Sequence, residues 1–303
     1  MRLFVGIDGG GSKTECVVAD ENNILGRFTA GTSKIQRAGK EAATASLRAA
    51  VQGAFYAAKV ATESVAHTCF GIAGASQPGV AEWAKSTLAT LMPGGVTITG
   101  DHIIAHEAAF HGKAGVLIIA GTGSIVFGRN AKGKTLRAGG WGPVVSDEGS
   151  GDWIGRNAVN AALLGNADGE RGALFEDILK AWEIKSADDI IRVANSYPPP
   201  NFAALFPHVL SACDAGDELA IDVLRRGGSQ LGGIALLVMH QLWLDNERVE
   251  IAGAGGALSN SKRLQQVVEN RIQAEWPKVD FRHDPIDPAQ GALYLARNAA
   301  PRS

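Results

Sequence analysis

The chain has 303 residues, enough for about two domains, and its formal net charge at neutral pH is −2. A charge so close to zero gives no reason to expect binding to nucleic acid or to an anionic membrane. The three cysteines, at positions 16, 69 and 213, are scattered and odd in number, so we expect reduced thiols in a cytoplasmic protein. We expect neither a signal peptide nor a membrane span, because the apolar runs are short.

The first strong signal is a glycine-rich turn between two apolar runs. Residues 3–7 read as a strand that ends at Asp8, and residues 16–19 read as a second strand after the turn Gly9-Gly10-Gly11-Ser12-Lys13-Thr14. The N–H groups of such a turn can form a concavity that suits phosphate, and Asp8 stands where Mg²⁺ would need an oxygen ligand. A glycine-rich hairpin with a capping Asp explains these residues equally well. A strand, not a helix, follows the turn, so it is neither a P-loop nor a Rossmann fingerprint.

Alternating strands and helices follow, as in an α/β protein. The expected strands are residues 24–29, 67–73 and 96–99, and the expected helices are residues 40–60, 79–91 and 102–110. Asp101 comes between a strand and a helix, at the kind of strand end where α/β folds bind ligands. It could accept a proton from a substrate hydroxyl, although a helix N-cap is an equally simple role.

The pattern of the N-terminus then returns. Residues 116–120 read as a strand, Gly121-Thr122-Gly123-Ser124 as a glycine–hydroxyl turn, and residues 125–128 and 135–138 as two further strands. The order of strand, turn, strand, polar turn and strand matches that of the N-terminal run. Such a repeat predicts two related domains, each with a turn suited to phosphate.

The remainder is mostly helical, with two further stretches that could carry chemistry. The first is a glycine-rich segment at residues 139–151. Asp147 or Glu148 could bind sugar hydroxyls there, and Trp141 could supply an apolar wall. The alternative is that the segment only caps the next helix. Gly253-Ala254-Gly255-Gly256 follows a strand and precedes a helix expected over residues 259–275, so it could approach adenine or phosphate, or make a tight connection.

Together these motifs resemble the actin-like ATPase and sugar-kinase superfamily. The closest resemblance is to the N-acetylglucosamine and glucosamine kinases of the BadF/BadG/BcrA/BcrD group, and it runs nearly the whole length of the chain. The matching segments are Asp8 to Thr14, Thr99-Gly100-Asp101, Ala120 to Ser124, Gly139 to Ser150 and Pro288 to Leu293.

This resemblance implies an α/β fold with two ribonuclease-H-like lobes, residues 1–112 and 113–289. The helix at residues 290–303 would pack back on the first lobe, and ATP and sugar would occupy a cleft between the lobes. The implied activity is that of an ATP-dependent and Mg²⁺-dependent amino-sugar kinase, and the implied assembly is a homodimer.

Roles for individual residues also follow from the resemblance. Asp8 would hold Mg²⁺, directly or through water, and Asp101 would take the proton of the sugar 6-hydroxyl. The expected phosphate contacts are Gly10, Gly11, Ser12, Lys13, Thr14, Thr122 and Gly123, with Gly253, Gly255 and Gly256 under the adenosine. The expected sugar contacts are Ser33, Lys34, Asp101, Ser124, Gly140, Trp141, Gly142 and Asp147.

Two departures from the family pattern leave the sugar open among N-acetylglucosamine, glucosamine, N-acetylmuramic acid and glucose. The loop after the third strand offers Ser33 and Lys34 where relatives usually have Asn, and Ile125 stands where animal enzymes often have Asn. An ATPase that drives a partner protein without a sugar acceptor is the alternative function. The Trp141 segment favours the kinase, because such an ATPase needs no sugar wall.

Overall fold

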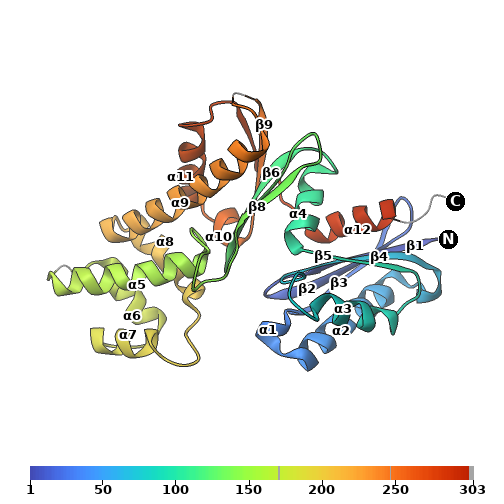
Figure 1. Cartoon of the computed structure of the whole chain (residues 1–303). Helices are drawn as coiled ribbons and strands as arrows, with labels where there is room; N and C mark the ends of the chain where they lie inside the picture. Colours follow the sequence, from blue (N-terminus) through green and yellow to red (C-terminus); the bar gives the residue numbers. More distant parts are fainter. Residues whose placement is uncertain (170, 246, 300–303) are drawn as a thin grey trace. The chain divides into compact units, whose positions relative to one another are not determined.

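The computed structural model describes residues 1–169, 171–245 and 247–299, and the chain forms two compact units (Figure 1). Unit 1 comprises Met1–Lys113 and Asp284–Ser303, and unit 2 comprises Ala114–His283. The last residues of the predicted C-terminal helix, 300–303, lie outside the described part of the chain. Each unit is described by itself below.

Unit 1 is built on a five-stranded sheet in the order β3-β2-β1-β4-β5. The first three strands form an antiparallel meander, whereas β4 and β5 run parallel to β1. The strands are β1 (Leu3–Gly9), β2 (Lys13–Ala19), β3 (Ile24–Gly31), β4 (Val65–Ile72) and β5 (Gly95–Thr99). The helices are α1 (Ile35–Ala38), α2 (Lys40–Ala58), α3 (Val80–Ala89), α4 (Asp101–Phe110) and α12 (Pro288–Ala299), with a 3₁₀ turn at Thr62–Ser64.

Side-chain alternation along the strands divides unit 1 into two layers of core. Leu3, Val5 and Ile7 pack with residues of α2 and α3 on one face. Phe4 points to the other face and packs with Ile104 of α4 and with α12. Figure 1 shows α12 running along the face of the sheet opposite α2 and α3. The helices α4 and α12 thus pack on the same face of the sheet.

Unit 2 repeats this plan with a sheet in the order β10-β9-β6-β7-β8. Its strands are β6 (Gly115–Ala120), β7 (Ser124–Arg129), β8 (Thr135–Gly139), β9 (Val249–Ala254) and β10 (Val279–Arg282). Again the first three strands in sequence are antiparallel neighbours, and the last two run parallel to the first. The predicted α/β repeat of two related lobes is therefore confirmed.

The helices of unit 2 form one core with the sheet. They are α5 (Gly151–Ala167), α6 (Ala173–Ala181), α7 (Ala187–Ala194), α8 (Phe206–Asp214), α9 (Glu218–Leu242), α10 (Gly256–Ser259) and α11 (Lys262–Gln273), with a 3₁₀ turn at Phe202–Leu205. The helix expected over residues 259–275 is α11, which begins at Lys262, and the short helix α10 before it was not expected. Ser261 caps α11, because its Oγ accepts the Leu264 N–H at 3.2 Å. Among the described residues, no helix combines the length and apolar character needed to cross a membrane.

Close backbone contact between α12 and β1 gives a stability test. A Cβ at Gly6 would lie 2.4 Å from both the Ala289 oxygen and the Leu293 nitrogen, which are backbone atoms that cannot swing aside. We expect Gly6→Ala to lower the free energy of unfolding by about 1–3 kcal/mol in chemical denaturation.

Gly233→Ala is the matched control. Gly233 lies within α9, and a Cβ there would meet nothing within 4 Å. This variant should raise stability by about 0.5–1 kcal/mol, because alanine favours helix over glycine. Equal effects of the two substitutions would contradict the close packing of α12 on β1.

Candidate functional site

The glycine turn of unit 1 connects β1 to β2 and presents unused backbone donors. Gly9 pairs with Thr14 at the end of the two-strand ladder, so residues 10–12 project beyond the sheet. Within the described part of the chain, no hydrogen bond is donated by the N–H groups of Gly10, Gly11 or Ser12. Consecutive free N–H groups in a turn can bind the oxygens of an anion such as phosphate.

Asp8 is the residue before the last in β1, and alternation along the strand places it on the face that α12 covers. Burial, with the negative charge of Asp101 next in size, raises the pKa of Asp8 from 3.8 to about 7. Glu15 and Asp287 raise it further, whereas Lys13 lowers it. More negative than positive charge therefore surrounds this buried carboxyl group.

Glu15 stands directly opposite Asp8 in the register of β1 and β2. Like charges at directly opposed positions of a sheet are unfavourable. Two cations offset this here, because Glu15 binds Lys13 at 2.8 Å and Arg27 at 2.6 Å. Glu15 is thus the link between the glycine turn and a larger polar network.

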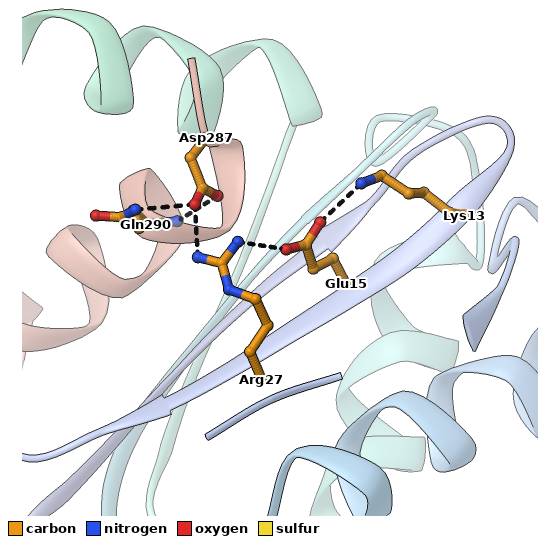
Figure 2. Close-up of polar contacts among 5 residues, drawn as sticks. All are labelled: Lys13, Glu15, Arg27, Asp287 and Gln290. Carbon is orange, nitrogen blue, oxygen red and sulfur yellow. Dashed lines mark hydrogen bonds and ion pairs between the residues drawn. The ribbon is translucent and has the colours of Figure 1, made fainter. Parts of the chain in front are cut away.

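That network joins β2, β3 and the start of α12 (Figure 2). Arg27 contacts Glu15 through one terminal nitrogen and Asp287 through the other, at 2.6 and 2.5 Å. Gln290 donates to Asp287 at 2.9 Å. Burial raises the pKa of Asp287, but the bonds from Arg27 and Gln290 outweigh it and hold the pKa below its usual value. The bond to Glu15 holds the pKa of Lys13 above its ordinary value.

Asp101 is the first residue of α4, directly after the N-cap Gly100. Its Oδ1 accepts the His102 N–H at 2.9 Å, and the side chain is 39% exposed. Oδ2 has no hydrogen-bond partner among the described residues. Because β5 runs parallel to β4, and β4 to β1, Asp101 and Asp8 lie at the carboxyl edge of the same sheet.

Two predicted contact residues of unit 1 are buried beneath the turn. The side chains of Thr14 and Ser33 are fully buried, and neither hydroxyl has a hydrogen-bond partner among the described residues. A Cβ at Gly9 would lie 2.7 Å from the Ser33 oxygen, which shows how closely Ser33 sits under the end of β1. Lys34 is half-buried as the N-cap of α1. Both buried side chains therefore lie close to Gly9, at the end of β1.

The second glycine turn lies in unit 2 between β6 and β7. The start of α5 holds it, because the Gly151 N–H donates to the Gly121 oxygen at 2.8 Å and the Asp152 N–H to the Thr122 oxygen at 3.2 Å. A Cβ at Gly255 would lie 2.5 Å from the Ala120 oxygen. The predicted segment at residues 253–256 therefore packs against this turn.

Asp147 binds the same turn from the glycine-rich segment. Its carboxylate accepts hydrogen bonds from the N–H groups of Ser124 and Gly142, yet burial still raises its pKa above the ordinary value. The residue also adopts a left-handed backbone with φ of +70°. Such strain in a non-glycine residue is common where a site needs one fixed geometry.

Within the same segment, residues 141 and 143–145 are exposed to solvent. Trp141 is 62% exposed, and Gly140 and Gly142, on either side of it, adopt φ of +70° and +95°. A large aromatic ring that the fold leaves uncovered can stack on a ligand. Ser124 is buried, and its hydroxyl donates to the Glu148 oxygen at 2.8 Å.

Some site residues escaped prediction from the sequence. Glu15, Arg27 and Asp287 carry the network at the turn, and Thr32 and Arg37 contact the turn itself. The one available signal was an acid, Glu15, directly before the apolar run at residues 16–19. The ion pair between Arg27 and Asp287 joins residues 260 positions apart, so it could be found only from the folded chain.

The fit of a metal ion can be tested on the donors that are present. The described residues contain no group of three or more His, Cys, Asp or Glu side chains arranged to hold a metal. Asp8 is a hard oxygen donor with an excess of negative charge around it. This suits Mg²⁺, which usually takes one or two protein carboxylates and completes its shell with water and substrate phosphates.

Comparison with known proteins gives the family. The model of the BadF/BadG/BcrA/BcrD ATPase family matches residues 5–296, and the chain belongs to this family. It is 30% identical to the N-acetylmuramic acid/N-acetylglucosamine kinase of Clostridium acetobutylicum over 98% of this chain and 99% of that protein. It is 29% identical to the N-acetyl-D-glucosamine kinase of Dictyostelium discoideum, over 98% of each chain.

A solved structure is also similar along the whole chain. It belongs to a Chromobacterium violaceum protein described provisionally as an N-acetylglucosamine kinase, with a TM-score of 0.75 and 25% identity. The match covers 98% of this chain and 99% of that chain. The predicted family and the predicted actin-like fold are therefore confirmed.

The raised pKa of Asp8 predicts a stability effect that depends on pH. The folded protein keeps the Asp8 proton up to about pH 7, whereas the unfolded chain loses it near pH 3.8. The stabilisation is thus complete below about pH 4 and is lost as the pH rises through 7. We expect Asp8→Asn, which is neutral throughout, to gain at least about 2 °C in Tm over the wild type on going from pH 5 to pH 8.

The measurement is thermal unfolding without nucleotide or divalent cation. Asp168→Asn, at an exposed position after α5, is the control and should show no such gain. A Tm difference between Asp8→Asn and wild type that is the same at both pH values would contradict the burial of an unbalanced carboxylate.

Proposed function

We propose that this member of the BadF/BadG/BcrA/BcrD family transfers the γ-phosphoryl group of ATP to the 6-hydroxyl of an amino sugar. The observation that carries the proposal is the set of groups at one sheet edge of unit 1: a turn with free N–H groups, Asp8 and Asp101. Phosphoryl transfer needs phosphate donors, a metal-binding acid and a base for the attacking hydroxyl, and this set supplies all three.

The two glycine turns bind the phosphates in this proposal. Gly10, Gly11 and Ser12 offer three consecutive N–H groups, and Thr122 and Gly123 belong to the corresponding turn of unit 2. Asp8 would hold Mg²⁺, directly or through water, and the ion would neutralise charge on the phosphate oxygens. The acids around Asp8 favour such a cation, because its charge offsets theirs.

Asp101 is the proposed base. Its Oδ1 is engaged by the His102 N–H, which fixes the carboxylate, while Oδ2 remains open to a substrate hydroxyl. As the hydroxyl oxygen attacks the γ-phosphorus, its proton passes to Oδ2 and the bond from that phosphorus to ADP breaks. Positioning of the acceptor and removal of its proton are the contributions this chain would make to the chemical step.

The acceptor is proposed to be N-acetylglucosamine or glucosamine. Relatives named as kinases of N-acetylglucosamine and of N-acetylmuramic acid match the chain end to end. Trp141 offers an uncovered ring that can pack on the apolar face of a hexose. Asp147, held by Ser124 and Gly142, retains lone pairs that can accept from sugar hydroxyls.

Release of ADP against a panel of sugars tests the activity. The panel is N-acetylglucosamine, glucosamine, N-acetylmuramic acid and glucose, each with Mg²⁺ and ATP, and a sugar-free sample gives the rate with water. We expect N-acetylglucosamine or glucosamine to give the highest kcat/KM, with a kcat at least about 100-fold above the turnover rate with water. If no sugar raises the rate, the chain is an ATPase without a sugar acceptor.

Asp101→Asn tests the base. The amide keeps the shape of the side chain but cannot take the proton, so kcat should fall on the order of 10²-fold or more while sugar binding stays measurable. Asp168→Asn, at an exposed position that belongs to neither glycine turn, serves as the control and should leave kcat unchanged. A near-normal kcat for Asp101→Asn would mean that Asp101 only begins the helix.

A further inference from the structure

We infer that Arg37 is an oxyanion-binding residue at the glycine turn, and that its guanidinium takes the terminal phosphate of ATP or a carboxylate on an acidic amino sugar. The inference rests on the proposed kinase function for the identity of the anion. Its structural basis, the contact of Arg37 with the turn, does not depend on that function. No role was predicted for Arg37 from the sequence.

Arg37 is fixed on the turn by one nitrogen. Nη1 donates to the Gly11 oxygen at 2.9 Å and approaches the Ser12 hydroxyl at 3.4 Å. Nε and Nη2 make no hydrogen bond to a described residue. The free edge of the guanidinium therefore carries donors in the fork geometry that matches carboxylate and phosphate oxygens.

The loop before α1 and Arg37 of α1 are both joined to the turn, at two successive residues of the turn. Thr32 donates from its hydroxyl to the Gly10 oxygen at 2.9 Å, next to the Arg37 contact with Gly11. The loop then closes into α1, where the Gly39 N–H donates to the Ile35 oxygen at 2.8 Å. The turn carbonyls are thus occupied by the loop, while the N–H groups of Gly10, Gly11 and Ser12 remain unused.

Arg37 differs from Lys13, the cation predicted to bind phosphate, in whether a carboxylate already pairs with it. Lys13 forms an ion pair with Glu15, and in Figure 2 it belongs to a network of two cations and two acids whose formal charges cancel. No carboxylate among the described residues pairs with Arg37. Its positive charge is therefore free to meet a substrate anion without first breaking an ion pair.

Calorimetric binding of tripolyphosphate to the full chain tests the phosphate source without any turnover. For Arg37→Gln we expect Kd to rise about 10-fold to 100-fold, the usual effect of losing a charge-assisted hydrogen bond. Arg37→Lys should recover part of the affinity, because it restores the charge but not the fork. Arg48→Gln is the matched control, since Arg48 is also exposed in unit 1 and bonds to a neutral partner, Thr90.

Turnover distinguishes the second source. N-acetylmuramic acid carries a carboxylate that N-acetylglucosamine lacks, so a carboxylate-binding Arg37 predicts a fall of about 10-fold to 100-fold in kcat/KM for the acidic sugar alone. In that case Arg37→Gln would leave tripolyphosphate binding unchanged. If the wild type turns over none of the sugars, the proposed function and the acidic-sugar source both fail. The tripolyphosphate measurement would still decide whether Arg37 binds phosphate.

Two results would overturn it. One is an Arg37→Gln variant that matches Arg48→Gln in tripolyphosphate binding and in turnover of both sugars. The other is a loss of affinity that is equal for tripolyphosphate and for uncharged adenosine and accompanies a fall in Tm, because this would assign Arg37 a structural role in holding the loop.

Discussion

The burial of the Asp8 carboxyl group among other acids is the constraint on which the charged contacts at this sheet edge of unit 1 depend. Asp8 faces Glu15 across the ladder, and Asp101 and Asp287 add negative charge at the same sheet edge. Such a group is unfavourable when ionised unless a cation is supplied. Part of this cost is offset within the fold by Lys13, and we propose that Mg²⁺ offsets the remainder when substrate binds.

Close packing of α12 on β1 makes this arrangement possible. The absence of a side chain at Gly6 lets the backbone of α12 approach the sheet, which brings Asp287 to the guanidinium of Arg27. Asp287 thereby joins a segment from the end of the chain to Arg27 of β3, and Arg27 in turn binds Glu15 of β2, the strand that leaves the glycine turn. The contacts around the turn thus depend on packing between Gly6 and Ala289, which are some 280 residues apart in the sequence.

The sequence was most informative where local rules decide the structure. Apolar alternation and glycine turns predicted both hairpins, and their repetition predicted two related sheets, because strand pairing between neighbours is set by short-range pattern. Sequence analysis missed α1 and α10, whose four residues each are too few for a periodic signal, and it began the helix α11 too early, before its cap at Ser261. That Ser33 contacts sugar stays a prediction, and the burial of its side chain close to Gly9 is a placement that only tertiary packing decides.

The product of the reaction tests the central claim most directly. Full-length protein is incubated with ATP, Mg²⁺ and N-acetylglucosamine or glucosamine, and the phosphorus spectrum is recorded by NMR with proton coupling. Transfer to the 6-hydroxyl gives a phosphate ester on a CH₂ group, so its phosphorus signal should be a triplet that grows as ADP appears. A doublet from a ring hydroxyl, or inorganic phosphate as the sole product, would contradict the account.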